Sequence, residues 1–121
     1  MDKRATFTLG KKGEDFVARW LALNGYYIVA RNYRSKVGEI DLIAKKRSLI
    51  AFVEVKARRK EFFPISTVIT TAKKRRLIKT AENFIVKFFA EEELIYRFDV
   101  AIILFDKDEI KFDYFEDAFS L

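Results

Sequence analysis

The stretch VGEIDLIAKKRSLIAFVEVKAR, residues 37–58, contains two apolar runs joined by a basic turn, and it carries charges where strands are usually most hydrophobic. The runs 38–45 and 49–57 have the length and the β-branched content of strands. The polar corner between them predicts a β-hairpin. This hairpin places Asp41, Glu54 and Lys56 within a sheet.

Strand alternation predicts where these charges lie. Successive strand residues point to opposite faces, so Glu54 and Lys56 share one face, about 6 to 7 Å apart. With a two-residue turn at Arg47 and Ser48, the numbers of paired residues sum to 95, and Asp41 lies opposite Glu54. Their Cβ atoms are then about 5 Å apart, so both carboxylates could hold one cation.

Two interpretations of these charges remain open. On an exposed sheet edge they would form a surface ion-pair cluster worth about 0 to 1 kcal/mol. However, Ile50 and Phe52 share the face of Glu54, and Ile43 shares that of Asp41. A face that begins apolar and ends charged is typical of a core whose rim opens into a site. The pattern alone favours neither interpretation.

The rest of the chain predicts one α/β domain. Helices are expected over residues 8–24 and 70–90, strands over 26–33, 38–45, 49–57, 94–105 and 109–115, and a loop over 58–67. The order α-β-β-β-α-β-β favours a mixed central sheet flanked by helices. A chain of 121 residues is long enough for one core, so residues 1–121 are expected to form a single domain.

Composition limits the chemistry open to this chain. It contains no Cys and no His, which excludes thiolate and imidazole sites, and any bound metal would be a hard cation such as Mg²⁺ or Mn²⁺ on oxygen ligands. A net charge of +6 and a pI near 9.5 suit a polyanionic partner. The sequence has no signal peptide and no run of about 20 apolar residues, so we expect a cytoplasmic protein without a membrane partner.

Other charged positions have open roles. Glu14 projects from the apolar stripe of the first predicted helix, where a buried carboxylate needs a partner. Near a helix N-terminus, however, the dipole alone favours a carboxylate. Arg97 and Asp99 either form an ion pair at the start of a strand, or Asp99 supports the site around Glu54 from behind.

The segment GEDFVARWLALNGYYIVARNYRSKVGEIDLIAKKRSLIAFVEVKAR, residues 13–58, resembles the YraN-type family of small predicted endonucleases. That family belongs to the PD-(D/E)XK nuclease superfamily, which includes archaeal Holliday junction resolvases. The resemblance covers about residues 10–106, and its most specific parts are GEIDLI at 38–43 and FVEVK at 52–56. It implies a restriction-endonuclease-like core.

The resemblance also implies roles for individual residues. Asp41 and Glu54 correspond to paired metal ligands, with the main-chain carbonyl of Val55 as a further ligand. Lys56 corresponds to the lysine that orients or deprotonates the attacking water, and Glu14 to a helix glutamate that completes the metal site. The implied activity is hydrolysis of phosphodiester bonds in branched or structured DNA with Mg²⁺ or Mn²⁺.

The chain departs from the family pattern at two positions. The proline of the superfamily motif has no counterpart, because Ile40 precedes Asp41. On the second predicted helix, Lys73 matches the usual lysine, but Lys74 stands where the family often has Gln. This second difference removes any amide-specific contact there and adds positive charge.

Basic residues near the predicted site indicate contacts to a nucleic acid, with DNA favoured over RNA. They are Arg58, Arg59, Lys60, Lys73, Lys74 and Arg76. Phe62 and Phe63, which lie between the two groups in the sequence, could stack on bases or could fill the core or a dimer interface.

Three classes of function are open to this sequence. The first is a metal-dependent endonuclease, and the second is a nucleic-acid-binding accessory protein of a repair or processing complex that keeps the nuclease fold but cleaves little. The third is a purely structural or protein-interaction domain, which should show no salt-dependent affinity for DNA. Asp41, Glu54 and Lys56 favour the endonuclease, because binding alone needs no carboxylates beside a phosphate. A resolvase-like activity would also require a homodimer, since junction cleavage uses two symmetric sites.

Overall fold

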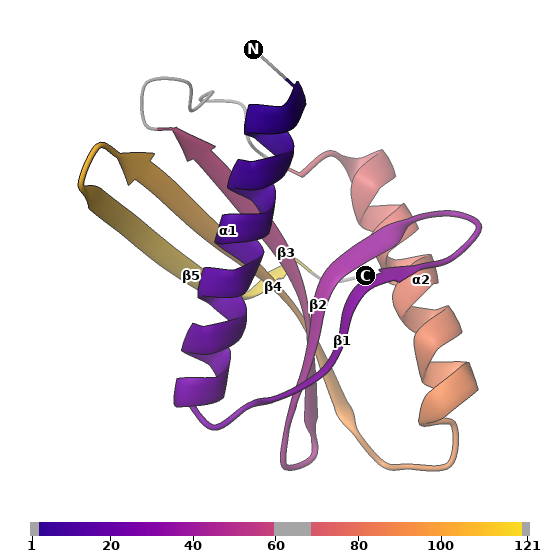
Figure 1. Cartoon of the computed structure of the whole chain (residues 1–121). Helices are drawn as coiled ribbons and strands as arrows, with labels where there is room; N and C mark the ends of the chain where they lie inside the picture. The colour runs from indigo at the N-terminus through magenta and orange to yellow at the C-terminus, as the bar shows by residue number, and fades with distance from the viewer. Residues whose placement is uncertain (1–2, 60–68, 120–121) are drawn as a thin grey trace.

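The computed structural model of the chain describes residues 3–59 and 69–119. Its elements, in chain order, are α1 (Lys3–Leu23), β1 (Tyr27–Arg34), β2 (Glu39–Lys46), β3 (Leu49–Arg59), α2 (Thr71–Phe88), β4 (Ile95–Asp106) and β5 (Glu109–Phe119) (Figure 1). The predicted order of helices and strands is confirmed.

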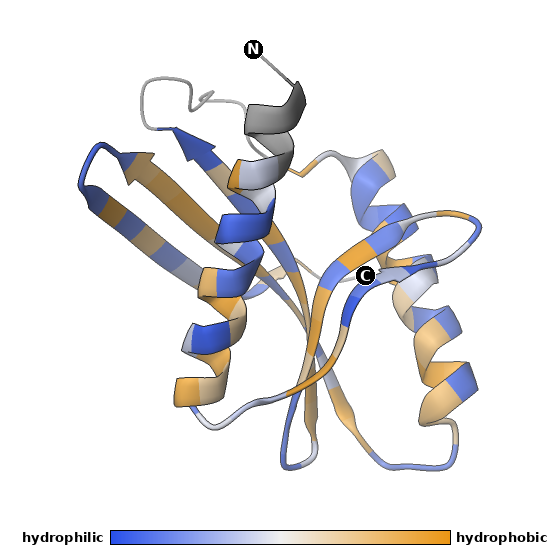
Figure 2. Cartoon of the chain, viewed as in Figure 1, coloured by the Kyte–Doolittle hydropathy of each residue, from blue (hydrophilic) through white to orange (hydrophobic). Residues whose placement is uncertain are grey.

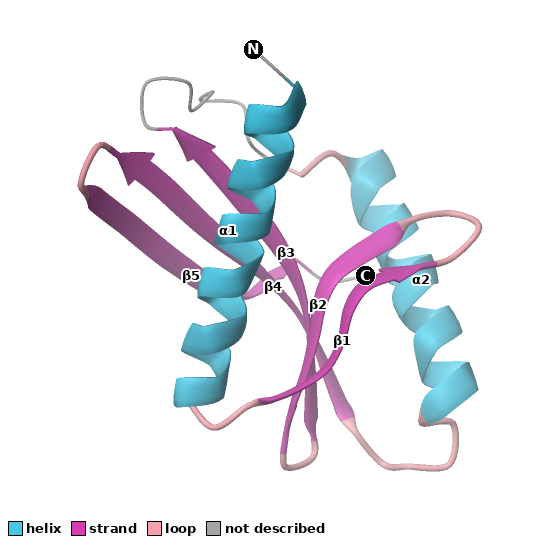
Figure 3. Ribbon diagram, in the orientation of Figure 1, coloured by secondary structure: helices cyan, strands magenta, loops and turns pink. Residues whose placement is uncertain are grey.

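The strands form one mixed sheet between the two helices (Figure 3). The spatial order is β1-β2-β3-β4-β5, so the strands follow one another across the sheet as they do in the sequence. Only β3 and β4 are parallel, and α2 connects them; the other neighbours are antiparallel. A parallel pair requires such a crossover, because its strands start from the same end of the sheet.

Each face of the sheet has its own apolar core. On the α1 face, Val17 and Leu21 pack with Val53 and other buried strand residues. On the α2 face, Phe52 and Phe84 belong to the second core. Strand alternation separates the two cores, and hydrophobic residues accordingly recur along the strands that both helices cover (Figure 2).

The hairpin of β2 and β3 has the predicted register. Its turn is Arg47 and Ser48, and the pairs run from Lys46 with Leu49 to Leu42 with Val53, each with numbers that sum to 95. Arg47 has a φ of 55°, a left-handed conformation that a two-residue hairpin turn requires. In this register Asp41 and Glu54 are the next opposite pair, one position beyond the end of the ladder at Leu42 and Val53.

Individual residues explain where α2 begins and how closely α1 packs on the sheet. Thr70 caps α2, because its side-chain oxygen accepts a hydrogen bond of 3.2 Å from the Lys73 amide. Gly13 lets α1 approach β3, because a Cβ atom at this position would lie 2.6 Å from the Cβ of Ala57.

In the described part of the chain, no helix is both long enough and apolar enough to cross a membrane.

The structure corrects several predicted boundaries. The first helix starts at Lys3 rather than at residue 8, and β5 extends to Phe119 rather than to residue 115. Arg58 and Arg59 belong to β3 and not to a loop, because the parallel ladder with β4 continues to the last of them, opposite Phe105. Sequence patterns miss such extensions because polar residues carry no signal of a partner strand. The remainder of the predicted loop, residues 60–67, lies outside the described residues.

Candidate functional site

Asp41 and Glu54 lie where β2 and β3 part. Beyond the pair of Leu42 with Val53, β2 curves away from β3 toward α2 (Figure 1). The Asp41 carboxylate still reaches β3, since its Oδ2 atom accepts a hydrogen bond of 2.8 Å from the Val55 amide. Both main-chain groups of a strand residue face the same neighbour. The Val55 carbonyl is therefore also directed toward β2, near the carboxylate.

Glu54 is a buried carboxylate held by two ammonium groups. Its side chain is 9% exposed, and its Oε1 atom lies 2.7 Å from Lys73 Nζ on α2 and 4.0 Å from Lys56 Nζ on β3. Glu54 and Lys56 project from the face of β3 that also carries Ile50 and Phe52, which are buried beneath α2. The charges thus continue a core face, and the interpretation of an exposed sheet edge is wrong.

The Asp41 carboxyl is strongly perturbed. Its pKa is raised to about 8, first by burial and then by the negative charge of Glu54, with a smaller contribution from Glu14. The hydrogen bond from the Val55 amide acts in the opposite direction. A carboxyl that holds its proton near neutral pH beside a second carboxylate indicates excess negative charge, which a bound cation would relieve.

The two lysines shift in opposite directions. Burial lowers the pKa of Lys56, and the positive charge of Lys73 lowers it further. Burial also disfavours the charge on Lys73, but its hydrogen bond to Glu54 and the charge of that carboxylate outweigh burial and raise the pKa of Lys73. Lys73 therefore keeps its positive charge and balances the negative charge of Glu54. Lys56 gives up its proton more readily, as a group that assists deprotonation must.

Glu14 lies on α1, near the same end of β2. It lines a depression of about 440 Å³ together with Asn32, Arg34 and Glu39. Burial raises the pKa of Glu14, and a side-chain hydrogen bond with Asn32 opposes this effect. The charge of Glu14 acts on Asp41 in turn. Glu14 is thus an electrostatic neighbour of the carboxylate pair, reached from the other side of the sheet.

The residues of this site offer oxygen donors to a divalent cation. The Asp41 and Glu54 carboxylates and the Val55 carbonyl are ligands of the kind that Mg²⁺ and Mn²⁺ prefer. Within residues 3–59 and 69–119, however, no group of three acidic side chains is arranged to hold a metal ion. Glu14 therefore does not form a three-carboxylate metal site with Asp41 and Glu54. A cation would also compete with Lys73 for the Oε1 atom of Glu54.

Two lysines predicted to contact nucleic acid are engaged within the protein. Lys73 forms the ion pair with Glu54. The neighbouring Lys74 is half-buried, and its ammonium lies 5.9 Å from the centroid of the Phe119 ring, in a cation–π contact. Part of the positive charge at the N-terminus of α2 is therefore engaged in contacts within the protein.

The other predicted contacts differ in exposure. Arg58 is half-buried, and its Nη1 atom donates a hydrogen bond of 2.8 Å to the carbonyl oxygen of Ala57. Arg59 and Arg76 are exposed on β3 and α2, where they can reach a ligand. The predictions for Lys60, Phe62 and Phe63 lie outside the described residues.

Asp99 belongs to a separate network on the other face of the sheet. It pairs with Val53, whose side chain lies in the α1 core. Its carboxylate is fully buried and accepts hydrogen bonds from Arg97, from the Tyr114 hydroxyl and from the Asp117 amide. Asp99 therefore forms a structural ion pair with Arg97, which confirms the first of the two interpretations of these residues; it does not support the carboxylate site from behind.

Two contributors near the site were not anticipated from the sequence. Asn32 has a φ of 52°, a left-handed conformation, and it hydrogen-bonds Glu14. Thr80 is fully buried, and its Oγ1 atom lies 3.0 Å from the Ser35 hydroxyl, which joins α2 to the loop before β2. For Asn32 the sequence did offer a signal, because Asn is depleted in strands and this one lies inside a predicted strand.

Fold and site together define a small α/β protein whose mixed sheet carries paired carboxylates and lysines where two strands separate. The profile of the uncharacterised protein family UPF0102 matches residues 13–103. The chain therefore belongs to this family, which confirms its resemblance to the YraN type.

Relatives named "UPF0102 protein" support this assignment. The relative from Chloroherpeton thalassium is 45% identical over 101 residues, which cover 83% of this chain and 78% of the relative. The relative from Caldicellulosiruptor saccharolyticus is 42% identical over 112 residues, 91% and 92% of the two chains. The relative from Alkaliphilus metalliredigens is 39% identical over 116 residues, 93% and 97% of the two chains. The similarity thus extends over nearly the whole domain.

Proposed function

We propose that this protein is a divalent-cation-dependent endodeoxyribonuclease with a restriction-endonuclease-like core, in the PD-(D/E)XK superfamily. One observation carries the proposal: Asp41 and Glu54 meet where β2 and β3 part, with Lys56 on the same face as Glu54. A purely structural sheet has no need for two adjacent carboxyl groups, of which Glu54 raises the pKa of Asp41, because like charges side by side are destabilising.

In this proposal Asp41, Glu54 and the Val55 carbonyl hold Mg²⁺ or Mn²⁺. The cation, when bound, neutralises charge on a phosphate and lowers the pKa of a water molecule. Lys56 lies two residues beyond Glu54, so its ammonium is placed to orient that water or to assist its deprotonation, as its lowered pKa favours. Glu14 adds negative charge from the α1 side.

The proposed substrate is DNA with branched or other non-linear structure. Exposed Arg59 and Arg76 lie on the two elements that also supply Glu54 and Lys73. Such side chains hold a phosphate backbone through contacts that do not depend on sequence. Cleavage of a four-way junction would require two symmetric sites, and therefore a homodimer.

The test is a cleavage assay on linear, nicked, flap and four-way-junction DNA with Mg²⁺ or Mn²⁺. We expect cleavage by the wild type, and a loss of at least about 100-fold in Asp41→Asn and in Lys56→Ala, because each variant removes a group that acts on the reacting phosphate or water. The matched control Asp113→Asn, at an exposed position on β5, should cleave like the wild type. Cleavage that survives both site substitutions would refute the assignment.

One observation favours a second function, that of a nucleic-acid-binding accessory protein with little cleavage of its own. Lys73 occupies an oxygen of Glu54 at 2.7 Å, and in the described part of the chain no three acidic residues are arranged around a cation position. Under this alternative the wild type would bind the same DNA with every metal and cleave none of it. The assay above therefore separates the two functions.

A further inference from the structure

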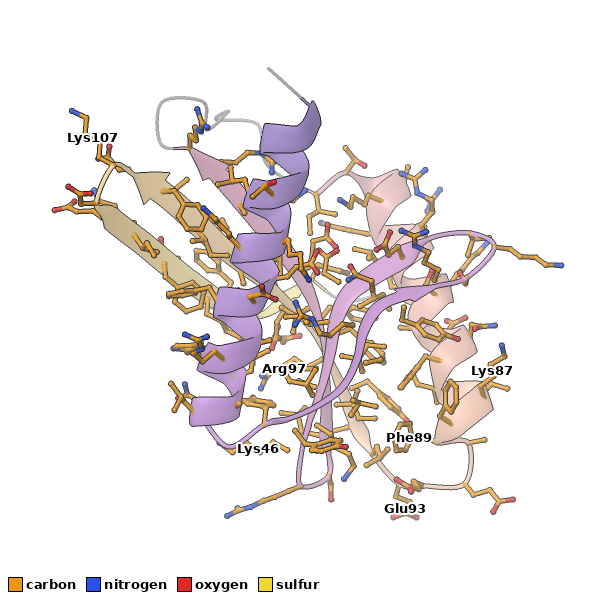
Figure 4. All side chains as sticks on the ribbon, viewed as in Figure 1. Lys46, Lys87, Phe89, Glu93, Arg97 and Lys107 are labelled. Atoms are coloured by element: carbon orange, nitrogen blue, oxygen red, sulfur yellow. The ribbon has the colours of Figure 1, made fainter. Side chains whose placement is uncertain are left out.

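A basic groove lies between α2 and the loop that joins β1 to β2. It has a volume of about 560 Å³ and is lined by Arg34, Ser35, Lys36, Lys79, Asn83 and Lys87, among others. Figure 4 shows Lys87 on the outer side of α2.

The loop is held firmly against the helix. A Cβ atom at Gly38 would lie 3.0 Å from Thr80 Oγ1 and 3.3 Å from the Arg76 carbonyl oxygen, so that only glycine permits this approach without displacing its neighbours. The Ser35 hydroxyl lies 3.0 Å from the same Thr80 oxygen. The Tyr33 hydroxyl also hydrogen-bonds Asn83 Oδ1. The two walls of the groove are thus fixed relative to each other.

The polar groups of the groove are available to a ligand. Within the described residues, Lys36, Lys79 and Lys87 form no ion pair, and Arg34 reaches only Glu39, at 3.5 Å with 76% of its side chain exposed. α2 carries six basic residues and one acidic residue over its length. Lysines without a counter-charge on both walls of a concave surface favour an anionic ligand.

The spacing of these groups matches an extended polyanion. Lys79 and Lys87 are eight residues apart in α2, which is about 12 Å along the helix at 1.5 Å per residue. One strand of duplex DNA carries a phosphate about every 3.4 Å of axis, so this span covers three to four phosphates. Lys79 lies about 9 Å beyond Lys73 on the helix, and Lys87 about 21 Å. The groove therefore leads away from the proposed cleavage site.

We propose that this groove binds the phosphate backbone of a second duplex arm of the DNA substrate, outside the segment that is cleaved. The inference rests on the proposed function for its substrate. The groove would then be the surface through which the protein distinguishes branched DNA from a short linear duplex. A rod-shaped polyanion fits a concave groove with charge on both walls, whereas a flat anionic membrane would contact only its rim.

The test compares two double variants that remove equal charge. Lys79→Ala/Lys87→Ala removes groove lysines, and Lys107→Ala/Lys111→Ala removes exposed lysines of the β4–β5 hairpin, whose Lys107 lies on the opposite side of the view from Lys87 (Figure 4). Binding is measured without divalent cations, to a four-way junction and to a single linear duplex of about 8 base pairs, which has no second arm. Thermal unfolding of both variants verifies that they fold.

We expect the groove variant to bind the junction about tenfold or more weakly near 0.1 M salt, because each lost phosphate contact lowers the salt slope by about 0.9. Its affinity for the short duplex should stay within about twofold of the wild type, as should both affinities of the hairpin variant. Lys79→Arg/Lys87→Arg, which keeps the charge, should restore junction binding.

Equal losses in the groove and hairpin variants would overturn the proposal, as would an equal loss for the junction and the short duplex. Loss of binding to vesicles of anionic lipid, with DNA affinity unchanged, would overturn it in favour of a membrane surface. Because the readout is binding without metal, it is independent of cleavage. A wild type that binds DNA selectively through the groove but never cleaves would remove the nuclease proposal and keep this one.

Discussion

Asp99 lies on one face of the sheet, and the pair of half-buried Asp41 and buried Glu54 lies on the other, in different surroundings. Asp99 accepts two hydrogen bonds of 2.8 Å from Arg97, one from Tyr114 and one from a main-chain amide. Each of its oxygens thus has two donors. Asp41 accepts one main-chain hydrogen bond and faces a second carboxylate.

This difference separates a completed structural cluster from the cluster that we propose as a functional site. In the Asp99 network, a planar guanidinium matches the carboxylate, and hydrogen bonds complete the cluster, so that no polar ligand is needed. At Asp41 and Glu54, two carboxyl groups lie side by side, the ammonium groups pair with Glu54 alone, and burial together with the charge of Glu54 holds the pKa of Asp41 high. The cation that we propose for this site would relieve this imbalance.

The largest expected effect on the free energy of unfolding comes from breaking the completed cluster. Asp99→Ala leaves the Arg97 guanidinium largely buried without its main partner, and we expect a loss of about 3 to 5 kcal/mol in urea unfolding. The control Asp113→Ala, at an exposed position of the same hairpin, should change it by less than about 0.5 kcal/mol. A loss below about 1 kcal/mol in Asp99→Ala would contradict the structural role.

The opposite sign is expected at Asp41. Because folding raises its pKa from 3.8 to about 8, the stability linked to its protonation is present below about pH 4 and is lost as the pH rises through 8. Asp41→Asn cannot ionise, so at pH 9 without divalent cations it should be more stable than the wild type by at least about 1.4 kcal/mol, the equivalent of one pKa unit.

The measurement for Asp41→Asn is urea unfolding at several pH values between 5 and 9. The difference between variant and wild type should grow with pH, and Mg²⁺ should stabilise the wild type more than the variant. A difference that does not change with pH would show that Asp41 ionises normally in the folded protein.

A smaller effect is expected at Lys73, the ammonium that balances Glu54. Lys73→Ala removes the group that competes with a cation for the Glu54 oxygen, so Mn²⁺ should bind about fivefold more tightly in the absence of DNA, a change of about 1 kcal/mol. Calorimetric titration measures this affinity. Lys74→Ala, which removes the same charge next to it but no contact to Glu54, serves as the control. Weaker Mn²⁺ binding in Lys73→Ala would indicate that the lysine supports the site and does not compete.

Much of the site could be predicted from local sequence. Strand alternation placed Glu54 and Lys56 on one face, and a two-residue turn fixed the register that brings Asp41 opposite Glu54. Both predictions rest on the short-range geometry of the chain. The role of Asp99 could not be decided in this way, because alternation does not reveal which face of β4 lies under α1.

Long-range contacts account for what the sequence missed. The extension of β3 through Arg58 and Arg59 depends on the partner residues in β4, which lie 46 positions further along the chain. The basic groove exists because Gly38 packs against α2 next to Thr80, a contact between segments that share no local pattern. Such contacts follow from packing rather than from propensity, so periodicity cannot indicate them.

The sequence by itself determined the order of elements, the hairpin register and the chemistry open to the site, since a chain without Cys or His has only oxygen ligands and lysines for this role. The tertiary structure decided which charges meet. It placed Lys73 on Glu54 and enclosed Asp99 in the opposite core. The physical reason is that burial and the distance between charged groups set their energies, and both depend on how the helices pack on the sheet.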